Sequence, residues 1–388
     1  MKIWKRALPL GIASMMLAAT PLAALAASPE FARSEEEWAQ LRDNRIDYEE
    51  LAGLIHEYNA TVQKNNIDYN EWRKEYGDTN DEVAERYREL ASDLENNMYY
   101  PDIDDDNYAA TMASIILNEK SIKDYNKLAD DNVEDSYVKY MTNLQTEANL
   151  VSTAQTEMIS YYLNQLQLQM DQKKKELLEV NYQSAVTNQG QGLVTETSVL
   201  TAQENLRAAD QALQNDQSAI DTGRQRLFVM LGWKYDDNPE IGEIPEVDED
   251  AIAAMDPVAD KEQALANSYT LLINKRKLEN ARSSDTKETL ETTIRENEAN
   301  IGASLTASYQ SVLAARTAYE LAVAQEALEQ KNLETAERSF QLGQISQVDY
   351  LTQKNTTETA QLNVPAAKLK LFQAAQNYEW AVNGLAGA

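Results

Sequence analysis

The sequence predicts an all-α protein made of duplicated long antiparallel helical hairpins, as in a protomer of a coiled-coil α-barrel, with little or no β structure. No glycine or proline occurs between Pro101 and Gly190, or between Gly302 and Gly343. These stretches are rich in Ala, Leu, Gln and Glu, which favour helices. A helix over even half of residues 102–189 would be about 65 Å long. We therefore expect an elongated bundle or tube.

The apolar residues of the second half follow a helical spacing. Intervals of 4, 3, 7 and 4 residues separate Leu305, Tyr309, Val312, Tyr319 and Val323. This is a narrow apolar seam of the coiled-coil type. The helix that carries it is expected to pack against other helices.

Two similar glycine motifs indicate an internal duplication. They read NQGQGLVTETSVLTAQEN (188–205) and RSFQLGQISQVDYLTQKN (338–355). Aligning Gly192 with Gly343 pairs Thr195 with Ser346. We expect each glycine to reverse the chain, and each hydroxyl residue to cap the returning helix. Asp349, three residues after Ser346, would complete a capping box, so each motif marks the tip of a hairpin.

The chain divides into four parts. Residues 1–27 have the cations, apolar run and small residues of a secretory signal peptide, so we expect an exported protein. Residues 28–235 form the first hairpin repeat with an N-terminal extension and a tip near 190–198. Residues 236–260 are an acidic linker with three prolines. Residues 261–388 form the second repeat, with its tip near 343–349.

Composition argues against several classes of function. The formal net charge is −29, which disfavours nucleic acid as a partner. There is no cysteine, and His56 is the only histidine, so a thiolate or imidazole metal site and a catalytic triad cannot be built. The acidic run Asp104 to Asp106 lacks the spacing of a calcium-binding EF-hand and is expected to be a solvated turn. We expect no enzyme, no metal and no cofactor.

The tip motifs QGLVTETSVLTAQENL and LGQISQVDYLTQKN resemble the Gly-x-x-(Ser/Thr)-x-x-Asp-x-Leu signature of the TolC family of outer membrane efflux proteins. The helix openings at Asn59 and Asn267 and the acidic linker are also similar, and the resemblance covers roughly residues 45–388. It implies that three copies form a hollow helical cylinder. The cylinder would dock a periplasmic adaptor protein of an inner-membrane pump and pass small-molecule or protein substrates outward.

The resemblance also assigns roles to residues of the tips. The acid of the second tip motif lines the entrance of the tube in that family, and it corresponds to Asp349; the equivalent in the first motif is Ser198, which is no acid. An entrance ring would therefore hold fewer carboxylates. The residues expected to meet the adaptor are Gly192, Leu193, Val194, Thr195, Gly343, Gln344, Ile345 and Ser346.

The chain departs from the family in one respect. Members that span an outer membrane insert paired β-barrel strands into each repeat, but the matching segments here are polar and helix-like (280–305) or short and acidic (95–111). The sequence therefore resembles a form without the barrel strands. We expect an exported protein of the cell envelope or periplasm, and association with the outer membrane stays an open alternative.

A second function is compatible with the same sequence. A coiled-coil protein that spaces or tethers envelope components, and conducts nothing, would have the same helical pattern.

Pro365 lies inside the final expected helix, where it should kink or break that helix.

Overall fold

The computed structural model describes residues 32–234 and 236–387, so the expected signal peptide lies outside the described residues. Helices dominate, and the strands that the described residues form are two residues long each. The prediction of an all-α fold of long hairpins with little or no β structure is confirmed.

The first part of the chain builds the base of the molecule, a projecting hairpin and a long hairpin. Its elements are α1 (Glu35–Leu41), β1 (Arg45–Ile46), a 3-10 turn (Tyr48–Glu50), α2 (Leu51–Tyr58), α3 (Ala60–Tyr76), α4 (Asn80–Asn96), α5 (Tyr108–Asp131), α6 (Ser136–Gly190) and α7 (Glu196–Met230). The second part contains β2 (Glu240–Ile241), α8 (Glu249–Ala254), α9 (Lys261–Asn267), α10 (Tyr269–Asn280), α11 (Ser284–Gln341), α12 (Gln347–Trp380) and a π-helical turn (Ala381–Leu385). Strands β1 and β2 pair in parallel, Arg45 with Glu240 and Ile46 with Ile241.

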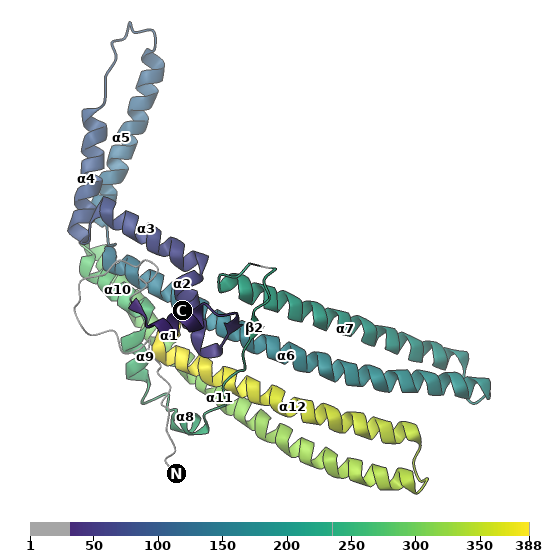
Figure 1. Cartoon of the computed structure of the whole chain (residues 1–388). Coiled ribbons are helices and arrows are strands. Elements are labelled where there is room, and N and C mark those ends of the chain that lie inside the picture. The colour runs from purple at the N-terminus through teal and green to yellow at the C-terminus, as the bar shows by residue number, and fades with distance from the viewer. Residues whose placement is uncertain (1–31, 235, 388) are drawn as a thin grey trace.

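The two long hairpins lie side by side in one row. Helix α6 pairs with α7, α11 pairs with α12, and α6 also contacts α12, which gives the order α7, α6, α12, α11 (Figure 1). With 55 residues in α6 and 58 in α11, these helices are about 82 and 87 Å long. Across the central contact, Asn355 Nδ2 donates to the Lys173 carbonyl oxygen at 2.5 Å. Within one chain, α7 and α11 are the free edges of the row.

The apolar core sits at the base, away from the tips. One cluster includes Leu51, Ile55, Leu227 and Phe228, and another includes Leu271, Ile301, Leu305, Val312 and Tyr378. Leu305 and Val312 of the predicted seam are fully buried, whereas Val323 is 42% exposed. The seam prediction is therefore wrong for Val323, because at that level α12 packs on a neighbouring face of α11, where Glu329 is buried and Thr357 binds its carbonyl oxygen.

The base repeats itself in atomic detail. Asn59 Nδ2 donates to the Met230 carbonyl oxygen, and Asn267 Nδ2 donates to the Val382 carbonyl oxygen, at 2.8 and 3.2 Å. A glycine with positive φ follows each contact, Gly232 at +90° and Gly384 at +118°. In each repeat, the asparagine near the start of the repeat therefore binds the backbone at the end of the helix that returns from the tip.

An unexpected helical hairpin, α4 with α5, projects from the end opposite to the tips (Figure 1). The stretch without glycine or proline after Pro101 forms two helices, since α5 stops at Asp131 and α6 starts after a break at residues 132–135. No glycine or proline marks this break. Asp135 is fully buried, caps α6 by accepting from Val138 N at 2.9 Å, and binds Arg276 Nε at 2.6 Å. Contacts between distant parts of the chain thus set the break.

Helix α12 runs through Pro365 without interruption, so a break at this residue is not observed. Pro365 and Gln361, whose carbonyl loses its usual N–H partner, are both exposed, so water can satisfy that carbonyl. Ala360, Ala366 and Leu371 on the opposite side are buried and hold the helix in place. In the described part of the chain, no helix is both long and apolar enough to cross a membrane.

Candidate functional site: the hairpin tips

The two long hairpins reverse through the same backbone turn. Gly192 has φ +73° and Gly343 has φ +70°. The amide of the residue after each glycine donates to the carbonyl four residues before the glycine, Leu193 N to Asn188 O and Gln344 N to Ser339 O, both at 2.8 Å. This is the Schellman arrangement, which satisfies the last carbonyls of a helix and places a glycine in the left-handed region.

The returning helices begin with the predicted caps. Ser346 Oγ accepts from Asp349 N at 3.1 Å, and Asp349 Oδ2 accepts from Ser346 N at 3.1 Å, which confirms the expected capping box. In the first tip, Thr195 Oγ1 accepts from Ser198 N at 3.2 Å. Asp349 and Ser198, the candidates for the entrance of a tube, are both exposed and lie in the first turns of α12 and α7.

The tips expose different apolar side chains. Leu193 is 70% exposed in the first tip, directly after the glycine, and Leu342 is 72% exposed in the second tip, directly before it. The second tip also carries a stacked pair, Phe340 and Tyr350, with ring centroids 5.1 Å apart. The sequence-based list omitted Leu342 and Phe340, since the motif begins at the glycine. The sequence could have indicated them, because two large apolar residues lie within four positions of a predicted turn.

A buried polar cluster supports the second tip. Glu329 on α11 accepts from Gln325, Asn332 and Gln353 at 2.5, 3.1 and 2.8 Å. These hydrogen bonds, led by that of Gln353, hold the pKa of Glu329 below its usual range. Thr357 Oγ1 donates to the Glu329 carbonyl oxygen at 3.0 Å. The cluster fixes the register of α11 against α12, and register determines where the tip residues lie.

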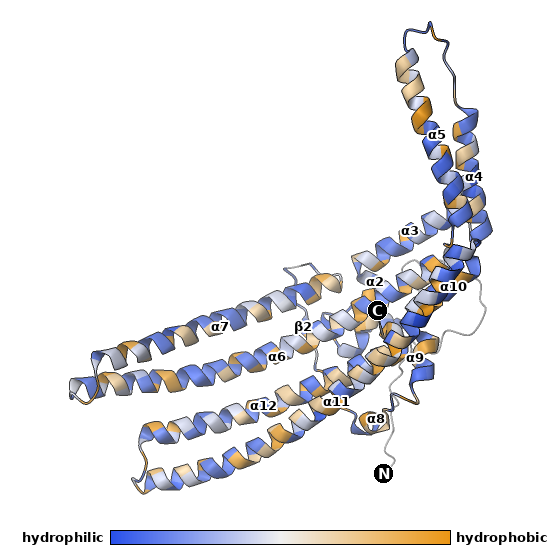
Figure 2. Ribbon diagram, turned by 180° about the vertical axis from the view of Figure 1, so that it is seen from behind, coloured by the Kyte–Doolittle hydropathy of each residue, from blue (hydrophilic) through white to orange (hydrophobic). Residues whose placement is uncertain are grey.

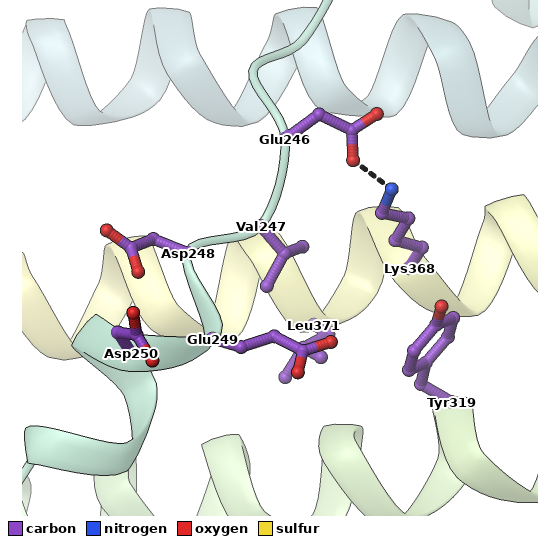
Figure 3. Close-up of a pocket in the computed structure, with 8 residues that line it drawn as sticks. All are labelled: Glu246, Val247, Asp248, Glu249, Asp250, Tyr319, Lys368 and Leu371. Carbon is purple, nitrogen blue, oxygen red and sulfur yellow. Dashed lines mark hydrogen bonds and ion pairs between the residues drawn. The ribbon is translucent and has the colours of Figure 1, made fainter. Parts of the chain in front are cut away.

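A hollow of about 560 Å³ lies at the linker, far from the tips (Figure 3). Its walls hold four acidic side chains, and one of them, Glu246, forms an ion pair with Lys368. Another, Asp248, caps α8 by accepting from Ala251 N at 2.9 Å. Among the described residues, no group of three or more His, Cys, Asp or Glu side chains is arranged so that it could hold a metal ion.

The other residues considered in the sequence analysis, His56 and the acidic run Asp104 to Asp106, make local contacts that stabilise the fold or lie in solvent. His56 is half-buried on α2, and its Nδ1 lies 2.9 Å from Glu147 Oε1, which raises the pKa of the imidazole through a hydrogen bond. Asp105 stabilises its own turn, where its Oδ2 accepts from Asp102 N at 3.1 Å. Asp104 to Asp106 are exposed, as expected for a solvated turn.

The fold is that of outer-membrane channels. The outer-membrane channel OprN superposes with a TM-score of 0.56 at 12% identity, over 95% of this chain and 98% of that chain. The CmeC outer membrane channel of Campylobacter jejuni gives 0.54 at 9% identity, over 95% of this chain and 93% of that chain. The outer membrane protein VceC of Vibrio cholerae gives 0.51 at 9% identity, over 89% and 96%.

No family model and no curated protein matches the sequence. The likeness is therefore one of structure, and it shows a TolC-like fold.

Proposed function

We propose that the chain is a non-enzymatic TolC-like duct component of the cell envelope. Three copies would close into a helical tunnel that docks a periplasmic adaptor of an inner-membrane pump and passes export substrates. The observation that carries this proposal is the open row of four long helices, which has one free edge at α7 and another at α11. Placing α11 of one copy against α7 of the next is a head-to-tail contact, and such contacts generate a ring when the rotation between copies closes.

The free edge at α11 has the surface that such a contact needs. Leu321 and Leu328 are 66% and 52% exposed and lie seven residues apart, on one face of the helix. Ala314, a further seven residues before, is also exposed. These residues form a second heptad seam that α12 does not cover. A seam of this kind is unfavourable in water unless another helix packs on it.

The tips are the proposed docking surface. Gly192, Leu193, Val194 and Thr195 form one tip, and Gly343, Gln344, Ile345 and Ser346 form the other, and Leu342 joins the second set because of its exposure. Asp349 and Ser198 follow directly on the returning helices, and we place them at the entrance of the tunnel. The caps hold these residues in fixed positions, so docking would order few side chains.

The assembly is tested with the chain lacking residues 1–27, by light scattering across a concentration series. Leu321→Asp should weaken trimer formation by at least about 30-fold per contact, because about 2 kcal/mol of apolar burial is lost. Val258→Asp is the matched control, since Val258 is 83% exposed in the loop between α8 and α9. A wild-type chain that stays monomeric at micromolar concentration would contradict the duct and favour the tethering alternative.

A further inference from the structure

Among the residues that the structure describes, none packs on the α4/α5 hairpin along most of its length. Its attachments to the body lie at its base, where Arg282 donates to the Ala129 carbonyl oxygen at 2.6 Å and to Asp81 Oδ1 at 2.8 Å. Figure 1 shows the rest of the hairpin projecting away from the other helices. Two helices packed only on each other are marginal in water, so a further contact is expected.

The face of α5 that points away from α4 is apolar near the loop. Ile115 packs towards α4 and is 3% exposed, whereas Ile116 and Leu117 are 61% and 65% exposed. Ala113 and Ala110, four and seven residues before Leu117 along the same face, are also exposed. Figure 2 shows these turns of α5 as a hydrophobic stretch at the isolated end of the molecule. Small residues beside Leu allow another helix to approach closely.

The charges on the two outer faces are complementary. Helix α5 exposes Lys120, Lys123 and Lys127, and none of them forms an ion pair with a residue that the structure describes. Helix α4 exposes Glu85 and Asp93, which also lack a cation among the described residues. The lysines without an ion pair therefore lie on the outer face of α5, together with the exposed Asp124, and exposed carboxylates without a cation lie on the outer face of α4.

The heights of these groups along the hairpin also match. Asn80 lies level with Asn132 at the base, and the rings of Tyr87 and Tyr125 are 6.3 Å apart further along. Because the helices are antiparallel and have equal rise, Lys127 lies level with Glu85. Beyond Asn96, where α4 ends, the loop carries Tyr99 and Tyr100, which are 67% and 59% exposed, and the Tyr100 hydroxyl donates to Glu119 Oε1 of α5 at 3.5 Å.

We propose that the outer face of α5 in one copy packs against α4 and the α4/α5 loop of the next copy. Three hairpins then close a ring of six helices at the end opposite to the tips. Lys127 meets Glu85 of the next copy, and Ala113 and Leu117 meet its Tyr99 and Tyr100. This inference rests on the proposed trimer and adds a second contact to it, separate from the seam on α11.

The ring explains the hairpin better than a membrane does. Asp102, Asp104, Asp105 and Asp106 stand at its end, and α5 carries seven charged residues among its 24. Burying these groups in lipid is costly, whereas a neighbouring hairpin can pair the lysines with carboxylates.

The chain has no cysteine, so introduced cysteines report contacts without background. Lys127→Cys and Glu85→Cys are made separately, mixed, and oxidised. On one chain, the two positions lie on opposite outer faces, on the order of 14 Å apart at Cα, too far for a disulfide. We expect a disulfide-linked dimer in the mixture only, and a covalent trimer from the double variant. Lys64→Cys, an exposed lysine on α3, mixed with Glu85→Cys should give no disulfide.

A charge exchange provides a second test. Lys127→Glu should weaken the trimer by about 5-fold, typical of a partly exposed pair, and Lys127→Glu with Glu85→Lys should restore it. A trimer by light scattering without the Lys127/Glu85 disulfide would overturn this inference and leave the duct standing, whereas a monomer would remove both. Flotation of the chain with phosphatidylcholine vesicles that is lost in Leu117→Asn would overturn it in favour of a membrane contact.

Discussion

The glycines at the tips and at the base share a left-handed backbone but differ in their surroundings, which makes a quantitative prediction possible. A Cβ added at Gly343 meets nothing within 4 Å, whereas one at Gly232 lies 2.5 Å from Tyr58 Cβ and 3.0 Å from its carbonyl oxygen. Gly343→Ala therefore adds only left-handed strain, about 1–2 kcal/mol. A lower entropy of the unfolded chain offsets about 0.4–1 kcal/mol of it. We expect a net loss of about 1 kcal/mol.

Gly232→Ala bears the same strain and must also displace Tyr58, which packs on the base core. Overpacking adds about 1–3 kcal/mol, so the expected loss is about 3 kcal/mol. Urea unfolding followed by far-UV circular dichroism measures both, and Gly343→Asn should lose less than Gly343→Ala because asparagine tolerates positive φ. Equal losses for Gly343→Ala and Gly232→Ala would refute this reasoning.

Two further predictions concern charged contacts of the base. Arg276→Ala should lower the free energy of unfolding by about 3 kcal/mol, because it leaves Asp135 buried without its cation. Glu279→Ala, which removes the exposed partner of the same arginine, should cost less than about 1 kcal/mol in the same urea assay; equal costs would contradict the role of burial. The hydrogen bond to Glu147 raises the pKa of His56, so its stabilisation is present below pH about 6.5 and is lost as pH rises through the raised pKa. The stability difference between wild type and His56→Gln should therefore shrink as pH increases. NMR titration of the single imidazole checks the pKa directly. A stability difference that grows with pH would contradict a stabilising contact between the charged imidazole and Glu147.

The parts of the fold that the sequence predicted depend on local chemistry. The tip turns need only a glycine, a hydroxyl cap and, in the second tip, Asp349 three residues later, all within seven positions. The break before α6 was missed because its determinants are far apart. Asp135 takes its partners Arg276 and Asn280 from α10, 141 and 145 residues further along the chain. No local signal replaces that contact.

The two turns were predicted in position, whereas the exposed apolar residues around them were not all predicted. The seam of α11 shows why, because Val312 and Val323 look alike in a helical pattern, yet one is buried by α12 and the other is exposed. Periodicity identifies a face of the helix, whereas the exact line along which α12 packs decides burial, since Glu329, closer to the tip than Val323, is buried. In the same way, Leu342 fits the apolar pattern of α11 in the sequence, and only the geometry of the turn shows that its side chain is exposed.

The two tips share the backbone hydrogen bonds that stabilise the turn but differ in the side chains that they expose. Their backbones make the same hydrogen bonds, from Leu193 to Asn188 and from Gln344 to Ser339, at the same 2.8 Å. The side chains around them have diverged, since one glycine is followed by leucine and the other is preceded by it. Because glycine and the caps alone maintain the turn, the neighbouring positions are free to change without a loss of fold. A duplicated chain can therefore present two different apolar surfaces on one conserved geometry.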